Sequence, residues 1–216
     1  DVIAREAVDQ TSLLFKAIKP KGGEMPVVMG AGGSGILLHE AIGHTFEADF
    51  NRKNVSIFAD QLNKKVCNEH INVVDDGTIP FNRGSVNFDD EGAEGQKTYL
   101  IKDGVLTSYL HDRISAKHYG VEPTGNGRRE SFRNMPIPRM RATYMEAGNV
   151  SESDIISSVK KGIFVDNFTN GQVQIGAGAQ ACGGDQVGLA GNLLQDELSM
   201  VDFIQCKHCL LYTSDA

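Results

Sequence analysis

The sequence predicts an α+β domain in which helices pack on a largely antiparallel, twisted sheet. Helical spacing of apolar residues is confined to a few segments. Between these segments, short apolar runs follow one another across Asp-Gly and Asn-Gly turns, without the regular strand–helix alternation of a parallel sheet. Glycine is abundant, at 24 of 216 residues, which favours many tight turns.

Composition excludes several classes of protein. With 40% hydrophobic and 23% charged residues, the chain has ordinary globular usage and is not expected to be disordered. The net charge of −7 argues against nucleic acid as the main partner. No apolar run reaches the length of a membrane helix, and neither a leader peptide nor an initiator Met is apparent, so we expect no membrane partner and a processed or truncated chain. Four cysteines do not make a disulfide scaffold, which favours a reducing, cytoplasmic location.

The first elements are predicted from periodicity and breakers. Apolar residues at helical spacing predict a helix over residues 1–19, which Pro20 and Gly22 end. An apolar run at 25–29 predicts a strand. A glycine-rich turn at 30–35 then leads into a second helix over 36–47.

The middle of the chain reads as short strands. The predicted strands are residues 55–58, 71–74, 85–88, 98–101 and 105–109. Asp103-Gly104 lies between the last two and predicts a hairpin turn. A helix is expected over 110–119.

Elements become sparser toward the C-terminus. An aperiodic stretch rich in Pro, Gly and Arg covers 121–141, and a loop of that length is expected to be functional or mobile. The elements predicted after it are a strand at 143–145, a helix at 151–161 capped by Ser151 or Ser153, strands at 164–168 and 172–175, and a helix at 193–203. Residues 206–216 have no clear place in the fold.

The segment His39-Glu40-Ala41-Ile42-Gly43-His44 carries the strongest chemical signal. Histidine is the commonest metal ligand, and a glutamate beside a ligand histidine is well placed to act as a general base. The two histidines are five residues apart, which puts them about 140° apart on a regular helix. A π-bulge at Gly43 would bring them to one side. The alternative is two unrelated histidines on an amphipathic helix.

A rival interpretation uses the turn before this helix. Gly30, Gly32 and Gly35 have the spacing of a dinucleotide-binding turn between strand and helix, and Asp60 is a candidate for the acidic residue that follows. This predicts a nicotinamide-dependent oxidoreductase. The short strands and hairpins that follow argue against it, and the glycines alternatively serve only to let the backbone turn tightly.

Arginines cluster within the aperiodic stretch. They are Arg128, Arg129, Arg133, Arg139 and Arg141. In an acidic chain, such a group is suited to hold a carboxylate or a peptide backbone. A solvated loop with Arg–Glu pairs is the alternative. His70, His111 and His118 are interpreted as surface or core histidines without a catalytic role.

Four blocks of sequence resemble the TldD/PmbA family of zinc metallopeptidases. The blocks are residues 29–51 (MGAGGSGILLHEAIGHTFEADFN), 76–92 (DGTIPFNRGSVNFDDEG), 123–148 (PTGNGRRESFRNMPIPRMRATYMEAG) and 162–171 (GIFVDNFTNG). The HExxxH motif makes the chain similar to the TldD-type subunit. The resemblance implies cytosolic hydrolysis of unfolded or small peptides, with a PmbA-like partner subunit or as a homo-oligomer.

The resemblance also implies roles for individual residues. His39 and His44 would be Zn²⁺ ligands, Glu40 the general base, and Cys182, within Cys182-Gly183-Gly184-Asp185, the third ligand. Arg128 and Arg129 are the candidate substrate-binding residues. A catalytically incomplete fragment or a partner subunit remains an alternative.

The resemblance covers residues 1–178 and sets the predicted domain boundary. These residues correspond to the family's C-terminal, catalytic domain, without its N-terminal domain. Residues 179–216 would be an atypical tail that looks foreign to the family.

Overall fold

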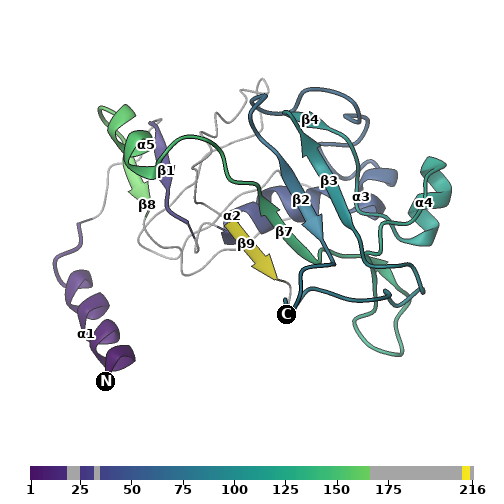
Figure 1. The fold of residues 1–216 in the computed structure, drawn as a ribbon, viewed down its shortest axis with the longest axis horizontal. Coiled ribbons are helices and arrows are strands. Elements are labelled where there is room, and N and C mark those ends of the chain that lie inside the picture. The colour runs from purple at the N-terminus through teal and green to yellow at the C-terminus, as the bar shows by residue number, and fades with distance from the viewer. Residues whose placement is uncertain (19–24, 32–34, 166–210, 215–216) are drawn as a thin grey trace.

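A computed structural model of the chain describes residues 1–18, 25–31, 35–165 and 211–214 (Figure 1). A five-stranded antiparallel sheet in the order β4-β3-β2-β7-β9 forms its centre. The strands are β2 (Val73–Asp76), β3 (Lys97–Lys102), β4 (Val105–Leu106), β7 (Ala142–Met145) and β9 (Leu211–Ser214). The predicted α+β class with an antiparallel sheet is confirmed.

Five helices and two small strand pairs complete the described part. The helices are α1 (Val2–Leu14), α2 (Gly35–Leu38), α3 (Ala48–Arg52), α4 (Arg113–Tyr119) and α5 (Glu152–Ser158). The first pair, β1 (Val27–Met29) with β8 (Ile163–Val165), is parallel. The second, β5 (Gly127–Arg128) with β6 (Ile137–Pro138), is antiparallel. Helix α2 lies against β7 and β9, behind the sheet in Figure 1.

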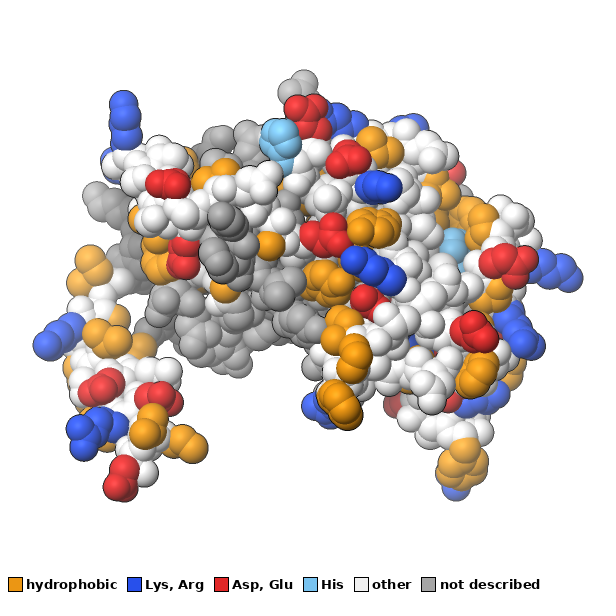
Figure 2. Space-filling model, in the orientation of Figure 1, with side chains coloured by type: hydrophobic (Ala, Val, Ile, Leu, Met, Phe, Trp, Pro, Cys, Tyr) orange, Lys and Arg blue, Asp and Glu red, His pale blue; other side chains and the backbone are white. Residues whose placement is uncertain are grey.

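Predictions that rest on contacts within a few residues of the chain are confirmed. Asp103 and Gly104 have φ values of +50° and +76°, as a type I′ hairpin turn between β3 and β4 requires. Ser151 caps α5 by accepting a hydrogen bond from the Asp154 N–H at 3.1 Å. Helix α1 forms as expected, but none of its residues is buried, and its apolar side chains lie on the surface (Figure 2).

Two predicted strands are wrong, because contacts distant in sequence shape these segments instead. Residues 55–58 form turns: Ser56 Oγ donates to the Thr45 carbonyl at 2.7 Å, and the Tyr109 hydroxyl donates to the Phe58 carbonyl. Residues 85–88 form a loop with a single bridge, from Phe88 to Glu94.

Three further features of the fold differ from the prediction. The strand expected to reach residue 109 ends at Leu106, because the Leu110 N–H turns to bond the Phe46 carbonyl at 2.9 Å. Helical structure continues past Glu47 as α3. Residues 206–216 were expected to have no clear place in the fold, but β9 within them pairs with β7 at the edge of the sheet. The strand expected at 172–175 and the helix at 193–203 lie outside the described residues.

The dinucleotide-binding interpretation is wrong for this fold. Asp60 does not end a strand but lies in a turn with φ of +59°. The main sheet is antiparallel, whereas that cofactor binds at the edge of a parallel one. Gly30 and Gly35 do flank the turn between β1 and α2, while Gly32 lies outside the described residues.

No helix in the described ranges is long and apolar enough to cross a bilayer.

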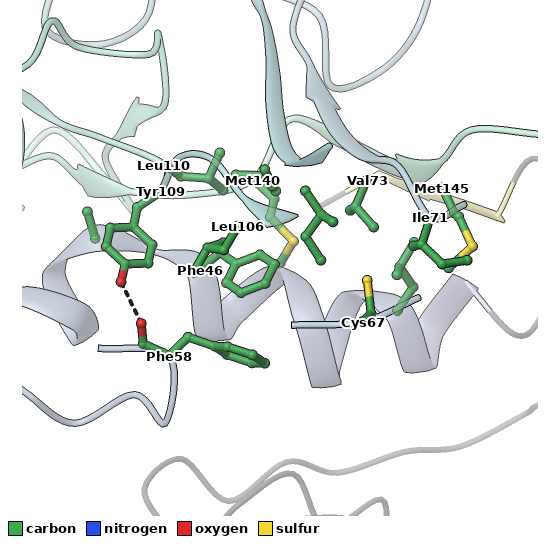
Figure 3. Packing of buried hydrophobic residues seen from close by; sticks show 14 residues of the cluster. Phe46, Phe58, Cys67, Ile71, Val73, Leu106, Tyr109, Leu110, Met140 and Met145 are labelled. Atoms are coloured by element: carbon green, nitrogen blue, oxygen red, sulfur yellow. Dashed lines mark hydrogen bonds between the residues drawn. The ribbon is translucent and has the colours of Figure 1, made fainter. Parts of the chain in front are cut away.

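The hydrophobic core lies between the sheet and the helical segment that begins with α2 (Figure 3). Its fully buried members include Phe46, Leu106, Tyr109, Leu110 and Met140. The Met140 sulfur points from the sheet side toward the helix in Figure 3. The core therefore fixes one face of the segment that carries His39 and His44.

Candidate metal centre

The His-Glu-His segment adopts the distortion that its spacing predicts. Residues His39–Gly43 form a π-helical turn between α2 and a 3₁₀ turn at His44–Phe46. The His44 N–H bonds the His39 carbonyl, five residues back. The two imidazole rings consequently lie side by side, with centroids 4.6 Å apart and planes at 88°. An undistorted helix would have aimed them in different directions.

Gly43 permits this turn to pack closely on the core. A Cβ atom at Gly43 would overlap the Met140 sulfur, and Met140 is fully buried. A side chain at this position would therefore force Met140 to move.

Glu47 holds the second histidine in place. Its Oε1 lies 3.1 Å from His44 Nδ1, and its Oε2 accepts a hydrogen bond from Arg139 Nη1 at 2.8 Å. The carboxylate is fully buried, and burial raises its pKa, while His44 and Arg139 act to lower it. An ionised carboxylate only accepts, so this contact favours the tautomer in which His44 carries a proton on Nδ1, and Nε2 would then be the nitrogen that faces a metal.

This donor set fits zinc. Imidazole nitrogens bind zinc at about 2.0–2.1 Å, which places the centroids of two tetrahedrally arranged rings roughly 5 Å apart. The observed 4.6 Å is close to that separation. A carboxylate on the outer nitrogen of a ligand histidine is also the usual supporting arrangement in metal sites. His39 and His44 are thus the residues able to hold the ion.

Zinc needs at least one further protein ligand. Within the described residues, no group of three His, Cys, Asp or Glu side chains comes together to hold a metal. Cys182, the predicted third ligand, lies outside these residues, and its role stays a prediction.

Glu40 lies on the same π-helical turn, directly after His39, and is half-buried. It is the carboxylate adjacent to the imidazole pair in sequence, as the predicted general base requires.

The two candidate substrate residues lie in a pocket that Met140 also lines. Arg128 is on β5, and Arg129 follows it, with Nη1 donating to the Asn134 carbonyl at 2.7 Å. Both line a pocket that also includes Arg139 and Met140. The structure therefore joins the arginine segment to the histidine segment through those two neighbours.

Sequence reasoning missed Glu47 as part of the centre. Its position three residues after His44 was an available signal, because side chains at that spacing share one face of a helix. Its bond to Arg139, from 92 residues further along the chain, had no local signal.

Comparisons with known proteins agree with this architecture. Residues 22–190 match the family described as PmbA/TldA metallopeptidase C-terminal domain. A metalloprotease TldD homolog of Haemophilus influenzae is 49% identical over 177 residues, which are 82% of this chain and 37% of the relative. A zinc metalloprotease TldD homolog of Saccharolobus solfataricus is 37% identical over 159 residues, 73% of this chain and 35% of the relative. The chain thus spans little more than a third of the curated relatives it matches.

Solved structures share the fold. The crystal structure of TldE from Thermococcus kodakarensis matches with a TM-score of 0.61 and 27% identity, over 71% of this chain and 35% of that one. A Thermotoga maritima protein matches with a TM-score of 0.63 and 25% identity, over 72% and 35%. The sheet, the packed helices and the match over most of its length show that this chain belongs to the PmbA/TldD metallopeptidase family, in the C-terminal domain.

Proposed function

We propose that this chain carries the catalytic centre of a zinc-dependent peptidase that hydrolyses peptide bonds in unfolded or small peptides. One observation carries the proposal: the π-helical turn sets the imidazoles of His39 and His44 side by side, with Glu40 on the same turn. The name of the Saccharolobus solfataricus relative, a zinc metalloprotease, supports the choice of metal.

The proposed roles follow from the donor atoms. His39, His44 and the Cys182 thiolate would hold the zinc ion, which when bound would supply Lewis-acid activation of water and of the scissile carbonyl. Glu47 keeps the His44 ring in its metal-binding tautomer. A Cys182→Ser variant that kept full zinc affinity would refute the assignment of the third ligand.

Glu40 handles the protons in this mechanism. Its carboxylate takes a proton from the attacking water and passes it to the leaving amine of the peptide. Arg128 or Arg129 lies in the pocket that Met140 also lines, where a guanidinium can bind the substrate and stabilise negative charge on the carbonyl oxygen. An extended peptide added to a sheet edge would be held through its backbone, with little sequence preference.

The assembly and the location are part of the proposal. The similarity to TldE supports a PmbA-like partner subunit or a homo-oligomer, and the lack of a disulfide scaffold supports a cytoplasmic location. Co-purification of the tagged chain from a cytosolic extract, followed by sizing, tests both. A monomer without a bound partner would refute the proposed assembly.

A Glu40→Gln variant tests the mechanism. It removes the proton acceptor and retains the shape of the side chain, so we expect zinc content to stay the same and cleavage of an unfolded peptide to fall by about 10²–10⁴-fold. Glu69→Gln, on an exposed carboxylate, is the matched control. Undiminished cleavage by the Glu40→Gln variant would show that another group is the base.

A further inference from the structure

A pocket of about 540 Å³ beside β5 and β6 has an unusual charge. Its charged lining residues are Arg83, Arg128, Arg129, Arg139, Arg141 and Glu130. Five arginines and one glutamate thus line the pocket in a chain whose net charge is −7. Carboxylates outside the lining lie beside two of these arginines, because Glu47 bonds Arg139 and Asp75 is close to Arg141. The volume is within the usual range for small-ligand sites. We call this site the arginine pocket.

Buried acidic residues hold the backbone of the arginine pocket. Asp75 on β2 is fully buried, and its Oδ1 accepts from the Arg141 N–H at 2.9 Å and from Thr143 Oγ1 at 2.7 Å. Its Oδ2 accepts from Asn126 Nδ2 at 2.7 Å. The Asp75 carboxylate therefore bonds an amide, a hydroxyl and a backbone N–H, and it anchors the arginine segment to the sheet.

The acidic loop before β3 acts in the same way. Asp89 Oδ2 accepts from the Gly127 N–H at 2.9 Å, and Asp90 Oδ2 accepts from the Arg129 N–H at 2.7 Å. These carboxylates position the backbone of β5 and the residue that follows it. They are bonded to main-chain groups, and their charges also act on the nearby Arg141 guanidinium.

Arg141 illustrates how an arginine side chain of the pocket is held in place. Its side chain is 8% exposed, and its Nε and Nη2 donate to the carbonyls of Gly125 and Gly127 at 3.0 and 3.2 Å. These acceptors carry no net charge. Burial lowers the pKa of the Arg141 guanidinium, as does the charge of Arg128, while the charges of Asp75, Asp89 and Asp90 act to raise it. An anion in the pocket would add a further favourable contact for its guanidinium groups.

The arginine pocket adjoins the candidate metal centre. Arg139 lines the pocket and bonds Glu47, whose other oxygen bonds His44. Met140, also in the lining, packs on Gly43 in the π-helical turn. Met140 therefore contacts both the pocket and the turn that carries the histidine pair.

We infer that the arginine pocket binds a carboxylate of the peptide substrate, either the C-terminal carboxylate or an Asp or Glu side chain. The inference rests on the proposed function for the choice of a peptide, and on the pocket for the choice of the anion. Guanidinium groups match a carboxylate with paired hydrogen bonds, which a backbone carbonyl cannot offer. A peptide held in this way presents bonds close to its carboxylate to the histidine pair.

Peptide binding to the purified 216-residue chain tests the inference. The probe is an alanine pentapeptide with an uncharged fluorophore at its N-terminus. Its binding is measured by fluorescence anisotropy. Three forms are compared: the free acid, the C-terminal amide, and the amide with one internal glutamate. We expect the free acid or the glutamate peptide to bind at least about tenfold more tightly than the neutral amide. The arm that shows the gain identifies the source of the carboxylate.

Matched variants connect the gain to the pocket. An Arg83→Gln/Arg128→Gln double variant should lose the preference for the acid. An Arg5→Gln/Arg113→Gln variant changes the net charge by the same amount outside the pocket and should keep it. Equal binding of all three peptides, or equal loss in both double variants with circular dichroism unchanged, would overturn the inference.

A third variant separates this result from the proposed function. In folded His39→Ala, zinc content should fall while the preference for the carboxylate persists. Loss of the preference in that variant would assign the carboxylate to the metal and overturn the inference. Retention of zinc would count against the metal centre and leave the pocket result standing.

Discussion

At the scale of single residues, Glu47 does most to prepare the metal centre. It is fully buried and bonds both His44 and Arg139, so its carboxylate links the proposed metal-binding imidazole to the arginine pocket. Supporting carboxylates of this kind fix ring orientation and tautomer. We therefore expect its effect on zinc affinity to exceed that of any exposed carboxylate of the chain.

A Glu47→Gln variant checks this role. The amide cannot hold the His44 ring in the same tautomer as firmly, and zinc affinity should fall by about 10–100-fold in competition with a chromophoric chelator. The matched control is Glu69→Gln, because Glu69 also lies near a histidine, His70, but at an exposed site. Equal zinc affinity in the two variants would contradict the account.

His111 gives the stability of the fold a pH dependence. Its ring is 3% exposed, Nδ1 has no hydrogen-bond partner within the described part, and burial lowers its pKa to about 4. The unfolded chain binds this proton near pH 6.5 and the folded chain only near pH 4. The contribution is complete above the unfolded pKa and is lost as pH falls through this window.

We predict that a His111→Phe variant is less sensitive to acid than the parent chain. Between pH 7 and pH 4.5 the parent should lose about 2–3 kcal/mol more unfolding free energy than the variant, measured by urea denaturation in the presence of chelator. His118→Phe, at an exposed ring, should behave like the parent. Parallel losses in parent and His111→Phe would refute the assignment.

At the scale of elements, the π-helical turn brings together two histidines five residues apart, the proposed metal-binding pair. Its packing depends on the absence of a side chain at Gly43, against which Met140 lies. The turn and the core are therefore coupled, and a methyl group at this point must displace one of them.

A Gly43→Ala variant should weaken zinc binding and cost about 1–3 kcal/mol of stability. Adding Met140→Ala should relieve the overlap, so that the double variant binds zinc more tightly than Gly43→Ala alone. Gly120→Ala, at the glycine that ends α4, removes a glycine elsewhere and should leave zinc affinity unchanged. Zinc affinity that is the same with and without the added methyl group would disprove the coupling.

The elements that the sequence predicts correctly are those with local causes. The π-helical turn follows from the angle between residues on a helix, and the hairpin at Asp103-Gly104 from backbone freedom at two positions. The wrong strand at 55–58 has a distant cause, because Ser56 and Phe58 are held by Thr45 and Tyr109. An apolar run alone does not show whether it pairs as a strand or packs as a turn.

The same limit explains which residues of the candidate metal centre could be predicted from the sequence. His39, Glu40 and His44 were recognisable because they share six residues of sequence. Arg139 joins them only through the fold, 92 residues from its partner Glu47. Long-range contacts of this kind are decided by packing and leave no periodic signal.

At the scale of the whole molecule, the antiparallel sheet connects the two halves of the site. Its strand β2 supplies Asp75, which bonds Asn126 and the backbone of Arg141 and so holds the arginine pocket. The sheet also contacts α2 and the hydrophobic core, which together hold the π-helical turn. The chain spans little more than a third of the curated relatives that it matches, so the assembly of the whole protein stays a proposal.

Zinc stoichiometry measures the central claim most directly, namely that His39 and His44 grip one ion. Purified chain, His39→Ala, His44→Ala and the control His118→Ala are dialysed against buffered zinc, and bound metal is measured by elemental analysis. The account predicts about one zinc per chain in the parent and the control, and strong loss in both site variants while each remains folded. Full zinc content in a folded His39→Ala or His44→Ala variant would contradict it.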